Sequence, residues 1–329
     1  VVATVSSLFS AFQEPAYMAS VTMLVSKKEY GRANGLTQMG QAVGSIVTPI
    51  LAGILYVAIG LRGIILIDIA SYFFAVTPLL FVRIPQPKII TAHDTENSNP
   101  ISDLALGWHY IRSRAGLLGL LLYYAMVNFF LNYSGVLNGP MILAAHSATI
   151  LGSVQTATGV GLLLGGLLMS TWGGPKKRKI PAVIGFITIA MFGLIIAGWQ
   201  RNPIFPIIGY FILLFVIPMA SGTSMAVWQS KVAPDIQGRV FAVRAMLARS
   251  MGPLAFLSAG PMADYIFEPL MREGGALAGT FVGSMLGVGP GRGIGLILVI
   301  SGVIGILVSL YAYLNPHIRN LEEELPDAV

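Results

Sequence analysis

The chain has 329 residues, of which 55% are hydrophobic and 10% charged, and its mean hydropathy is +0.76. A soluble domain carries about 25% charged residues, so this composition excludes a water-soluble globular protein. The net charge of +6 does not indicate a nucleic-acid partner, because the basic residues form short runs between apolar blocks rather than one patch.

Long apolar blocks follow one another along the chain, and a block of 18 or more apolar residues is typical of a membrane span. We predict nine spans, each long enough to cross about 30 Å of hydrocarbon at about 1.5 Å per residue. They cover approximately residues 1–25, 33–58, 63–83, 116–138, 147–171, 180–200, 204–229, 240–267 and 292–314. The predicted fold class is therefore an all-α integral membrane protein.

Lysine and arginine are unequally distributed between the connectors on the two sides of these spans. One side holds Lys27, Lys28, Arg32, Arg83, Lys88, Arg112, Arg114, Lys176, Lys177, Arg178, Lys179, Lys231, Arg239 and Arg319. The other side holds Arg62, Arg201, Arg272 and Arg292. Basic connectors stay inside, so we expect a multi-pass protein of the cell (inner) membrane with its C-terminus in the cytoplasm.

The longest connector on the basic side, about residues 84–115, separates three predicted spans from six. Within it Ile101, Leu104, Trp108 and Ile111 recur at helical spacing. A helix lying on the membrane surface and a cap leading into the next span both explain this pattern. The expected domains are the remainder of one helical half (1–84), an inter-half loop (85–115), a six-helix half (116–314) and a cytoplasmic tail (315–329).

An internal repeat supports a unit of six spans. Ser26-Lys27 precedes Gly31-Arg32 at the start of one span, and Ser230-Lys231 precedes Gly238-Arg239 six spans later. Only three spans precede the long connector, and residue 1 falls within a span on the outer side without a Met or a signal. We therefore expect three further spans upstream, which would make the intact protein six plus six.

Two small-residue patterns resemble known transporter motifs. The first, Gly35, Gly44, Thr48, Pro49 and Gly53, is similar to the antiporter signature of the fifth helix of the major facilitator superfamily. The second, Gly166, Gly173, Lys176, Lys177 and Arg178, is similar to the basic loop after the eighth helix, with Ser170 at its acidic position. Ordinary small-residue packing and a basic turn that only fixes topology are the respective alternatives.

The chain thus resembles the major facilitator superfamily, in its macrolide-efflux and enterobactin-exporter-like branch. The resemblance implies a two-bundle fold with nine of twelve helices present, numbers four to twelve. It further implies alternating access between two halves, usually driven by protons. The expected partners are a small-molecule substrate, protons and the lipid bilayer, for a monomer with no nucleic acid, no cofactor, no metal and no enzymatic activity.

Ionisable groups within spans are the candidates for coupling, since each costs roughly 2.5–3.5 kcal/mol at the bilayer centre. Glu14, about 16 Å from the inner end of its span, is the first candidate for a proton carrier. The alternative is a carboxyl that bonds backbone freed by Pro15. Arg249 would pair with Glu14, bind an anionic substrate or form a structural ion pair. Asp68 and Asp264 are further coupling candidates.

Hydroxyl and amide side chains concentrate in the first, fourth and seventh predicted spans, which we therefore expect to line an aqueous path. The cavity candidates are Gln13, Asn128, Asn132, Tyr133, Ser224 and Gln229. The resulting hypothesis is a proton-coupled exporter of a small amphipathic molecule of the drug, macrolide or siderophore class. A non-transporting membrane assembly or scaffold protein, and an uptake or lipid transporter of the same fold, are the alternatives.

Overall fold

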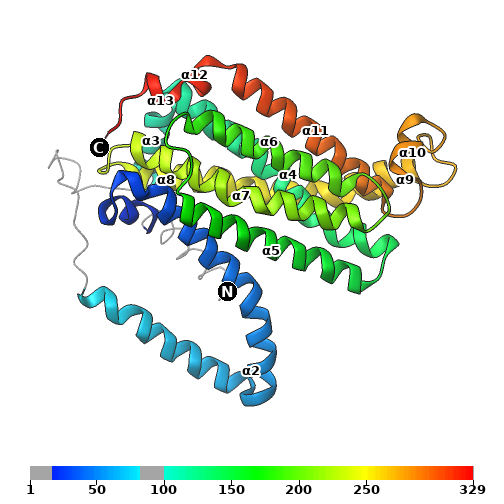
Figure 1. Cartoon of the computed structure of the whole chain (residues 1–329), viewed down its shortest axis with the longest axis horizontal. Helices are drawn as coiled ribbons and strands as arrows, with labels where there is room; N and C mark the ends of the chain where they lie inside the picture. Colours follow the sequence, from blue (N-terminus) through cyan, green and yellow to red (C-terminus); the bar gives the residue numbers. More distant parts are fainter. Residues whose placement is uncertain (1–16, 82–99, 329) are drawn as a thin grey trace.

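The computed structural model describes residues 17–81 and 100–328, and in these ranges all regular structure is helical (Figure 1). Residues 17–24 are helical and a 3-10 turn, Lys27–Glu29, follows. The long helices are α2 (Tyr30–Phe81), α4 (Ala115–Ala145), α5 (Ala148–Trp172), α6 (Lys179–Gly198), α7 (Ile204–Lys231), α8 (Gln237–Met262) and α11 (Arg292–Leu314). The shorter ones are α3 (Pro100–Arg112), α9 (Glu268–Met271), α10 (Phe281–Leu286), α12 (Pro316–Arg319) and α13 (Leu321–Glu324).

Among the described residues, 6 helices are long and apolar enough to cross a membrane. They are α4, α5, α6, α7, the continuous stretch Gln237–Met271 and α11. That stretch joins α8 to α9 through a single π-helical turn, Ala263–Phe267. These helices coincide with the six spans predicted after the long connector, so the all-helical membrane fold expected from the apolar blocks is confirmed.

α2 contains both of the predicted spans 33–58 and 63–83. Its backbone leaves helical geometry at Gly60, where φ is 64° and ψ is −178°, a combination that glycine adopts without a Cβ clash. Beyond Gly60 the second arm of α2 turns back and lies apart from the other helices (Figure 1). Phe74 and the coupling candidate Asp68 are exposed on this arm, so Asp68 lies away from the bundle.

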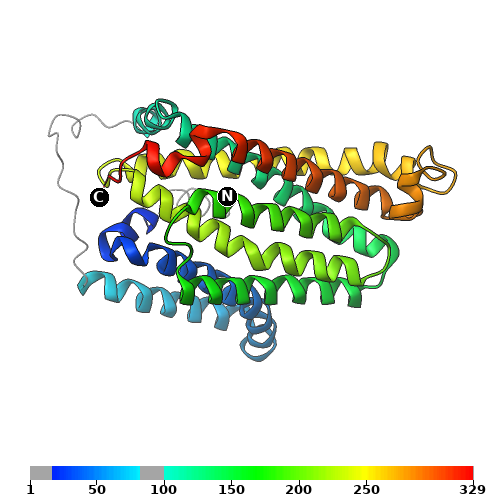
Figure 2. The same cartoon turned by 45° about the horizontal axis from the view of Figure 1, so that its top comes forward.

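The best-packed part of the molecule is formed by α4, α6, α7 and α11, with α6 in contact with both α7 and α11. α6 contributes Ile180, Ile187, Met191 and Leu194, all fully buried. Figure 2 shows these helices running nearly parallel along the long axis of the molecule. This arrangement leaves α2 and α5 together on one side of the bundle.

α3 packs across the end of α8, and a two-residue turn separates it from α4. Ile111 is fully buried, whereas Trp108 is 41% exposed. Asp103 pairs with Arg239 at the start of α8, with 2.7 Å between Oδ1 and Nε. The predicted amphipathic helix therefore caps the bundle with one face and exposes Trp108 on the other.

The basic connectors gather at one end of the bundle, which we call the basic end. It comprises residues 25–29, the α5–α6 connector 173–178, the α7–α8 connector 232–236 and the tail after α11 (Figure 1). The main chains of α2 and α5 meet at this end. A Cβ at Gly31 would overlap the carbonyl oxygen of Gly173, and one at Gly35 would lie 2.5 Å from the Ser170 nitrogen. Small residues are therefore required at this crossing.

Only some residues of the two transporter-like motifs lie at the crossing of α2 and α5. Gly35 and Gly166 lie in it, Gly166 against Met39, whereas a Cβ at Gly44 would meet nothing within 4 Å. Gly173 ends α5 with a φ of 80°. Lys176, Lys177 and Arg178 are exposed, and the surroundings of Thr48, Pro49 and Gly53 lie outside the described part.

A substitution that adds one methyl group tests the close approach of α2 and α5. We expect Gly31→Ala to lower the free energy of unfolding by about 1–3 kcal/mol, because the added Cβ forces the two backbones apart. The measurement is the thermal unfolding midpoint in detergent. Gly40→Ala on the same helix is the control, because its Cβ meets nothing within 4 Å. Equal midpoints for the two variants would contradict the crossing.

Candidate functional site

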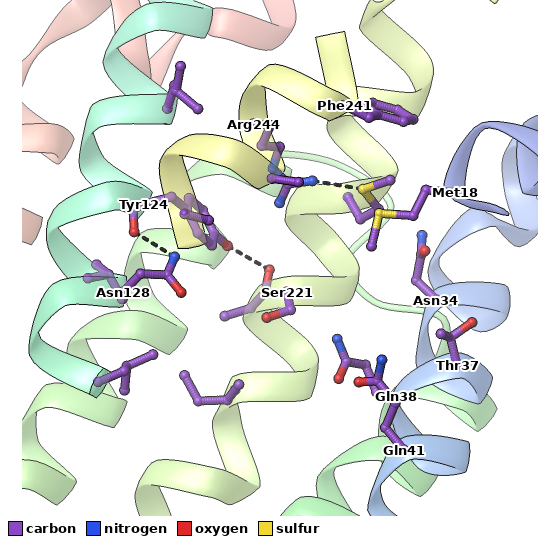
Figure 3. Close-up of a pocket in the computed structure, with 18 of the residues that line it drawn as sticks. Met18, Asn34, Thr37, Gln38, Gln41, Tyr124, Asn128, Ser221, Phe241 and Arg244 are labelled. Carbon is purple, nitrogen blue, oxygen red and sulfur yellow. Dashed lines mark hydrogen bonds between the residues drawn. The ribbon is translucent and has the colours of Figure 1, made fainter. Parts of the chain in front are cut away.

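A cavity of ≈ 270 Å³ lies between the first arm of α2, α4, α7 and α8 (Figure 3). Its polar side chains are Tyr17, Asn34, Thr37, Gln38, Gln41, Tyr124, Asn128, Ser221 and Arg244. The rest of its wall is apolar and includes Leu121, Leu131, Ile217, Met225 and Phe241. Such a mixture of apolar wall and separate hydrogen-bonding groups is typical of a small-molecule site.

One wall of the cavity is a polar stripe along α2. Asn34, Thr37, Gln38 and Gln41 follow one another at helical spacing and point towards α4 in Figure 3. These residues were not among the predicted cavity candidates, because the polar content of the spans assigns the aqueous path to every third one. Their spacing was the signal that could have identified them.

The opposite wall is held in place by hydrogen bonds to the main chain. The Tyr124 hydroxyl donates to the Ala220 carbonyl on α7 at 2.9 Å. The Asn128 amide donates to the Tyr124 carbonyl at 2.8 Å. Asn128 lines the cavity as the sequence predicted, and its orientation is fixed before any ligand arrives.

Arg244 on α8 places a positive charge in the cavity wall. Its guanidinium carbon lies 5.7 Å from the centre of the Tyr124 ring and 5.5 Å from that of Trp228. Both distances are within the range of a cation–π contact. Its Nη1 also lies 2.8 Å from the Met225 sulfur (Figure 3). The aromatic rings thus hold the cation in place.

Arg249, the arginine predicted from the sequence as a coupling candidate, is exposed. It lies five positions after Arg244, an offset that turns a helical side chain about 140° around the axis. Of the two arginines, Arg244 is therefore the one that lines the cavity.

A layer of amide side chains closes the cavity towards the basic end. The Asn34 Nδ2 of α2 donates to the Gln229 Oε1 of α7 at 2.8 Å. The Thr22 hydroxyl donates to the Gln237 Oε1 of α8 at 2.9 Å, and Gln237 Nε2 donates to the Gln229 carbonyl at 3.0 Å. Gln229 and Gln237 are fully buried. Gln229 therefore belongs to this closing layer rather than to the cavity wall.

Three other predicted lining residues lie off the cavity. Asn132 donates to the Asn128 carbonyl of its own helix at 2.7 Å. Tyr133 is buried and its ring centre lies 5.2 Å from that of Phe129. Ser224 is fully buried in α7. The polar content of a span does not tell which face a given side chain occupies.

The remaining candidates are not part of the cavity as described. Asp264 is exposed in the π-helical turn. Nearby Glu268 caps α11, accepting hydrogen bonds from the backbone of Gly291 at 3.2 Å and Ile294 at 3.0 Å. Gln13 and Glu14 lie outside the described residues.

Comparison with known protein families gives a match to one family over most of the chain. The sequence profile described as "Major Facilitator Superfamily" matches residues 1–256. Macrolide efflux protein A of Streptococcus pyogenes is 27% identical over 275 residues, which are 81% of this chain and 66% of that protein. The match to that relative thus spans slightly less than two thirds of its length.

Two further relatives carry related names. Macrolide efflux protein A of Enterococcus faecalis is 28% identical over 252 residues, covering 74% of this chain and 76% of the relative. The enterobactin exporter EntS of Shigella flexneri is 24% identical over 188 residues, covering 56% of this chain and 44% of the relative.

The amide layer generates a stability prediction. Asn34→Leu removes the donor that Asn34 supplies to the buried Gln229 Oε1, and we expect a loss of about 1–3 kcal/mol. The thermal unfolding midpoint in detergent measures it. Thr156→Val is the control, since the exposed Thr156 hydroxyl donates within its own helix to Gly152. If Asn34→Leu unfolds no earlier than Thr156→Val, the layer does not connect the helices.

Proposed function

The chain belongs to the Major Facilitator Superfamily, and we propose that the protein is a secondary exporter of a small amphipathic molecule. The observation that carries the proposal is the cavity between α2 on one side and α4, α7 and α8 on the other. Transporters of alternating access bind their substrate between two helical bundles and expose that site to one side at a time.

The conformation fits one state of such a cycle. α2 and α5 touch at the basic end, and the amide layer lies between the cavity and that end. We assign the basic end to the cytoplasm of an inner-membrane protein, because lysine and arginine concentrate there. In this assignment the cavity is closed to the cytoplasm, as an exporter requires when it releases its substrate outside.

The proposed substrates are macrolides or siderophore-like molecules; the relatives' names mention macrolides and enterobactin. Such molecules combine apolar surface with many oxygen acceptors. The amides of Gln38, Gln41 and Asn128 can donate to those acceptors, while Leu131 and Ile217 contact apolar groups. The volume of ≈ 270 Å³ is smaller than a macrolide, so binding of one requires the walls to move apart.

The proposal keeps Glu14 as the proton carrier of a monomeric transporter. Glu14 precedes the cavity-lining pair Tyr17 and Met18 by three and four residues. In the span that the sequence predicts over residues 1–25, helical spacing would give Glu14 the same face as these two residues. Burial there would favour reversible protonation. Arg244 replaces Arg249 as the cation proposed to tune it.

The cavity is tested by filling it. We expect Ala245→Trp to reduce accumulation of a radiolabelled macrolide in inverted membrane vesicles to the level of vesicles without the protein, because Ala245 lines the cavity. The protein is expressed from its complete gene for this assay. Met246→Trp is the control, since Met246 is 56% exposed on the same helix. Equal accumulation by both variants would reject the cavity as the substrate site.

Proton coupling is tested separately at Glu14. We expect Glu14→Gln to abolish macrolide accumulation driven by a proton gradient, because the amide cannot take up and release a proton, while expression stays unchanged. Accumulation is followed after an imposed pH step in the same vesicles. Glu273→Gln, at an exposed site between α9 and α10, is the control. Wild-type accumulation by Glu14→Gln would refute the carrier role.

A further inference from the structure

The C-terminal tail folds back onto the basic end and surrounds a buried lysine. Lys231, the last residue of α7, is 6% exposed. Its ammonium group donates to the Glu322 carbonyl at 2.6 Å and to the Leu325 carbonyl, and it lies 3.1 Å from the Asp327 carboxylate. The tail therefore supplies the oxygen atoms that replace water around this charge.

The same carboxylate reaches the other side of the basic end. Asp327 Oδ2 lies 2.8 Å from the ammonium group of Lys27, which precedes α2. Lys27 and Lys231 are the lysines of the two Ser-Lys repeats found in the sequence, six predicted spans apart. Asp327 thus joins equivalent positions of the two repeats through a single side chain.

Hydrogen bonds and apolar packing hold the tail in the position from which Asp327 contacts both lysines. The Ala328 amide donates to the Ser230 carbonyl at 2.9 Å. The Glu322 carboxylate accepts from the Ile180 amide at 3.0 Å, at the start of α6. Leu321 is fully buried. The tail is consequently anchored to the second half of the chain, and within the described residues Asp327 extends from it to Lys27 of the first half.

The electrostatics favour an engaged contact at neutral pH. Partial burial raises the pKa of Asp327, but hydrogen bonds from Lys27 and Lys231 and the charges of these two lysines lower it, and the net pKa lies below the ordinary value. Exposed ion pairs contribute little to stability, and the Lys27 pair is of that kind. The Lys231 ammonium is buried, however, so loss of its counter-charge is costly.

We propose that residues Leu321–Ala328 form a latch that holds the basic end closed, with Asp327 as the contact that must break when this end opens. The proposal rests on the proposed function, because alternating access requires Lys27 and Lys231 to separate in the opposite state. The latch would then set the population of the closed state.

The test measures the basic end directly. These 329 residues contain no cysteine, and any cysteine elsewhere in the full-length protein is replaced by serine, so that spin labels attach only at introduced sites. Lys28→Cys and Lys177→Cys place labels at exposed positions on either side of the α2–α5 crossing. Distances between the labels are measured by pulsed electron paramagnetic resonance in nanodiscs, with the protein expressed from its complete gene.

Asp327→Asn is compared with two variants in this background. We expect it to raise the population of long distances by about five-fold or more. Asp327→Glu retains the charge and should keep the short distance. Glu323→Gln removes one exposed carboxylate from the same tail and should also keep it. If Asp327→Asn does not fold, Lys27→Gln breaks the same contact from the other side.

Each outcome decides the proposal. A distance distribution for Asp327→Asn that matches the wild type overturns the latch, and a lower unfolding midpoint without a change in distance assigns the tail a purely structural role. A long-distance population in Asp327→Asn, absent from Glu323→Gln, supports the latch. Because the distances need no substrate, failure of macrolide transport in a protein that shows this opening would reject the proposed function alone.

Discussion

The contact of the α2 and α5 main chains at Gly31 and Gly173 is the constraint on which the closed end depends. Only residues without a Cβ allow these backbones to touch. Their approach brings Asn34 within hydrogen-bonding distance of Gln229, and it brings the segment ahead of α2 close enough for Lys27 to reach the tail. A side chain at Gly31 would separate all of these pairs together, so the small-residue motif acts on the whole basic end.

The contacts that close the basic end change from neutral hydrogen bonds near the cavity to ion pairs at the surface. Next to the cavity the helices are joined by neutral amides and a hydroxyl, whose separation costs less in a medium of low dielectric than separation of ions would. Further out, where Asp327 is half exposed, the connection is ionic. Water there can solvate the separated charges of Lys27 and Asp327. This order would suit a contact that opens and closes repeatedly, as the proposed alternating access requires.

Much of the fold followed from the sequence because lipid imposes long apolar helices. The spans predicted at 180–200 and 292–314 match α6 and α11 within about two residues. The break in α2 falls in the predicted gap around Gly60, but the direction of its second arm depends on backbone angles that the hydrophobic pattern does not contain.

The sequence pattern likewise could not tell which polar side chains face the cavity. Asn128 was identified from a polar span, whereas Tyr133 and Ser224 came from equally polar spans and face the helical core.

The contacts of the C-terminal tail show why long-range pairs could not be predicted from the sequence. The sequence predicted only a cytoplasmic tail at 315–329, whereas the structure shows that Asp327, in a stretch without periodicity, makes the two lysine contacts. Its partner Lys27 lies about 300 residues away, and no local pattern encodes such a pair. The repeat did mark both lysines, because it placed Lys27 and Lys231 at matching positions of two spans. The chain has one tail for these two positions, so a single carboxylate serves both. A lysine repeated at equivalent positions of the two repeats therefore indicates where the two halves of this chain meet. The C-terminal tail, which is not part of the repeat, is the segment that can contact both lysines.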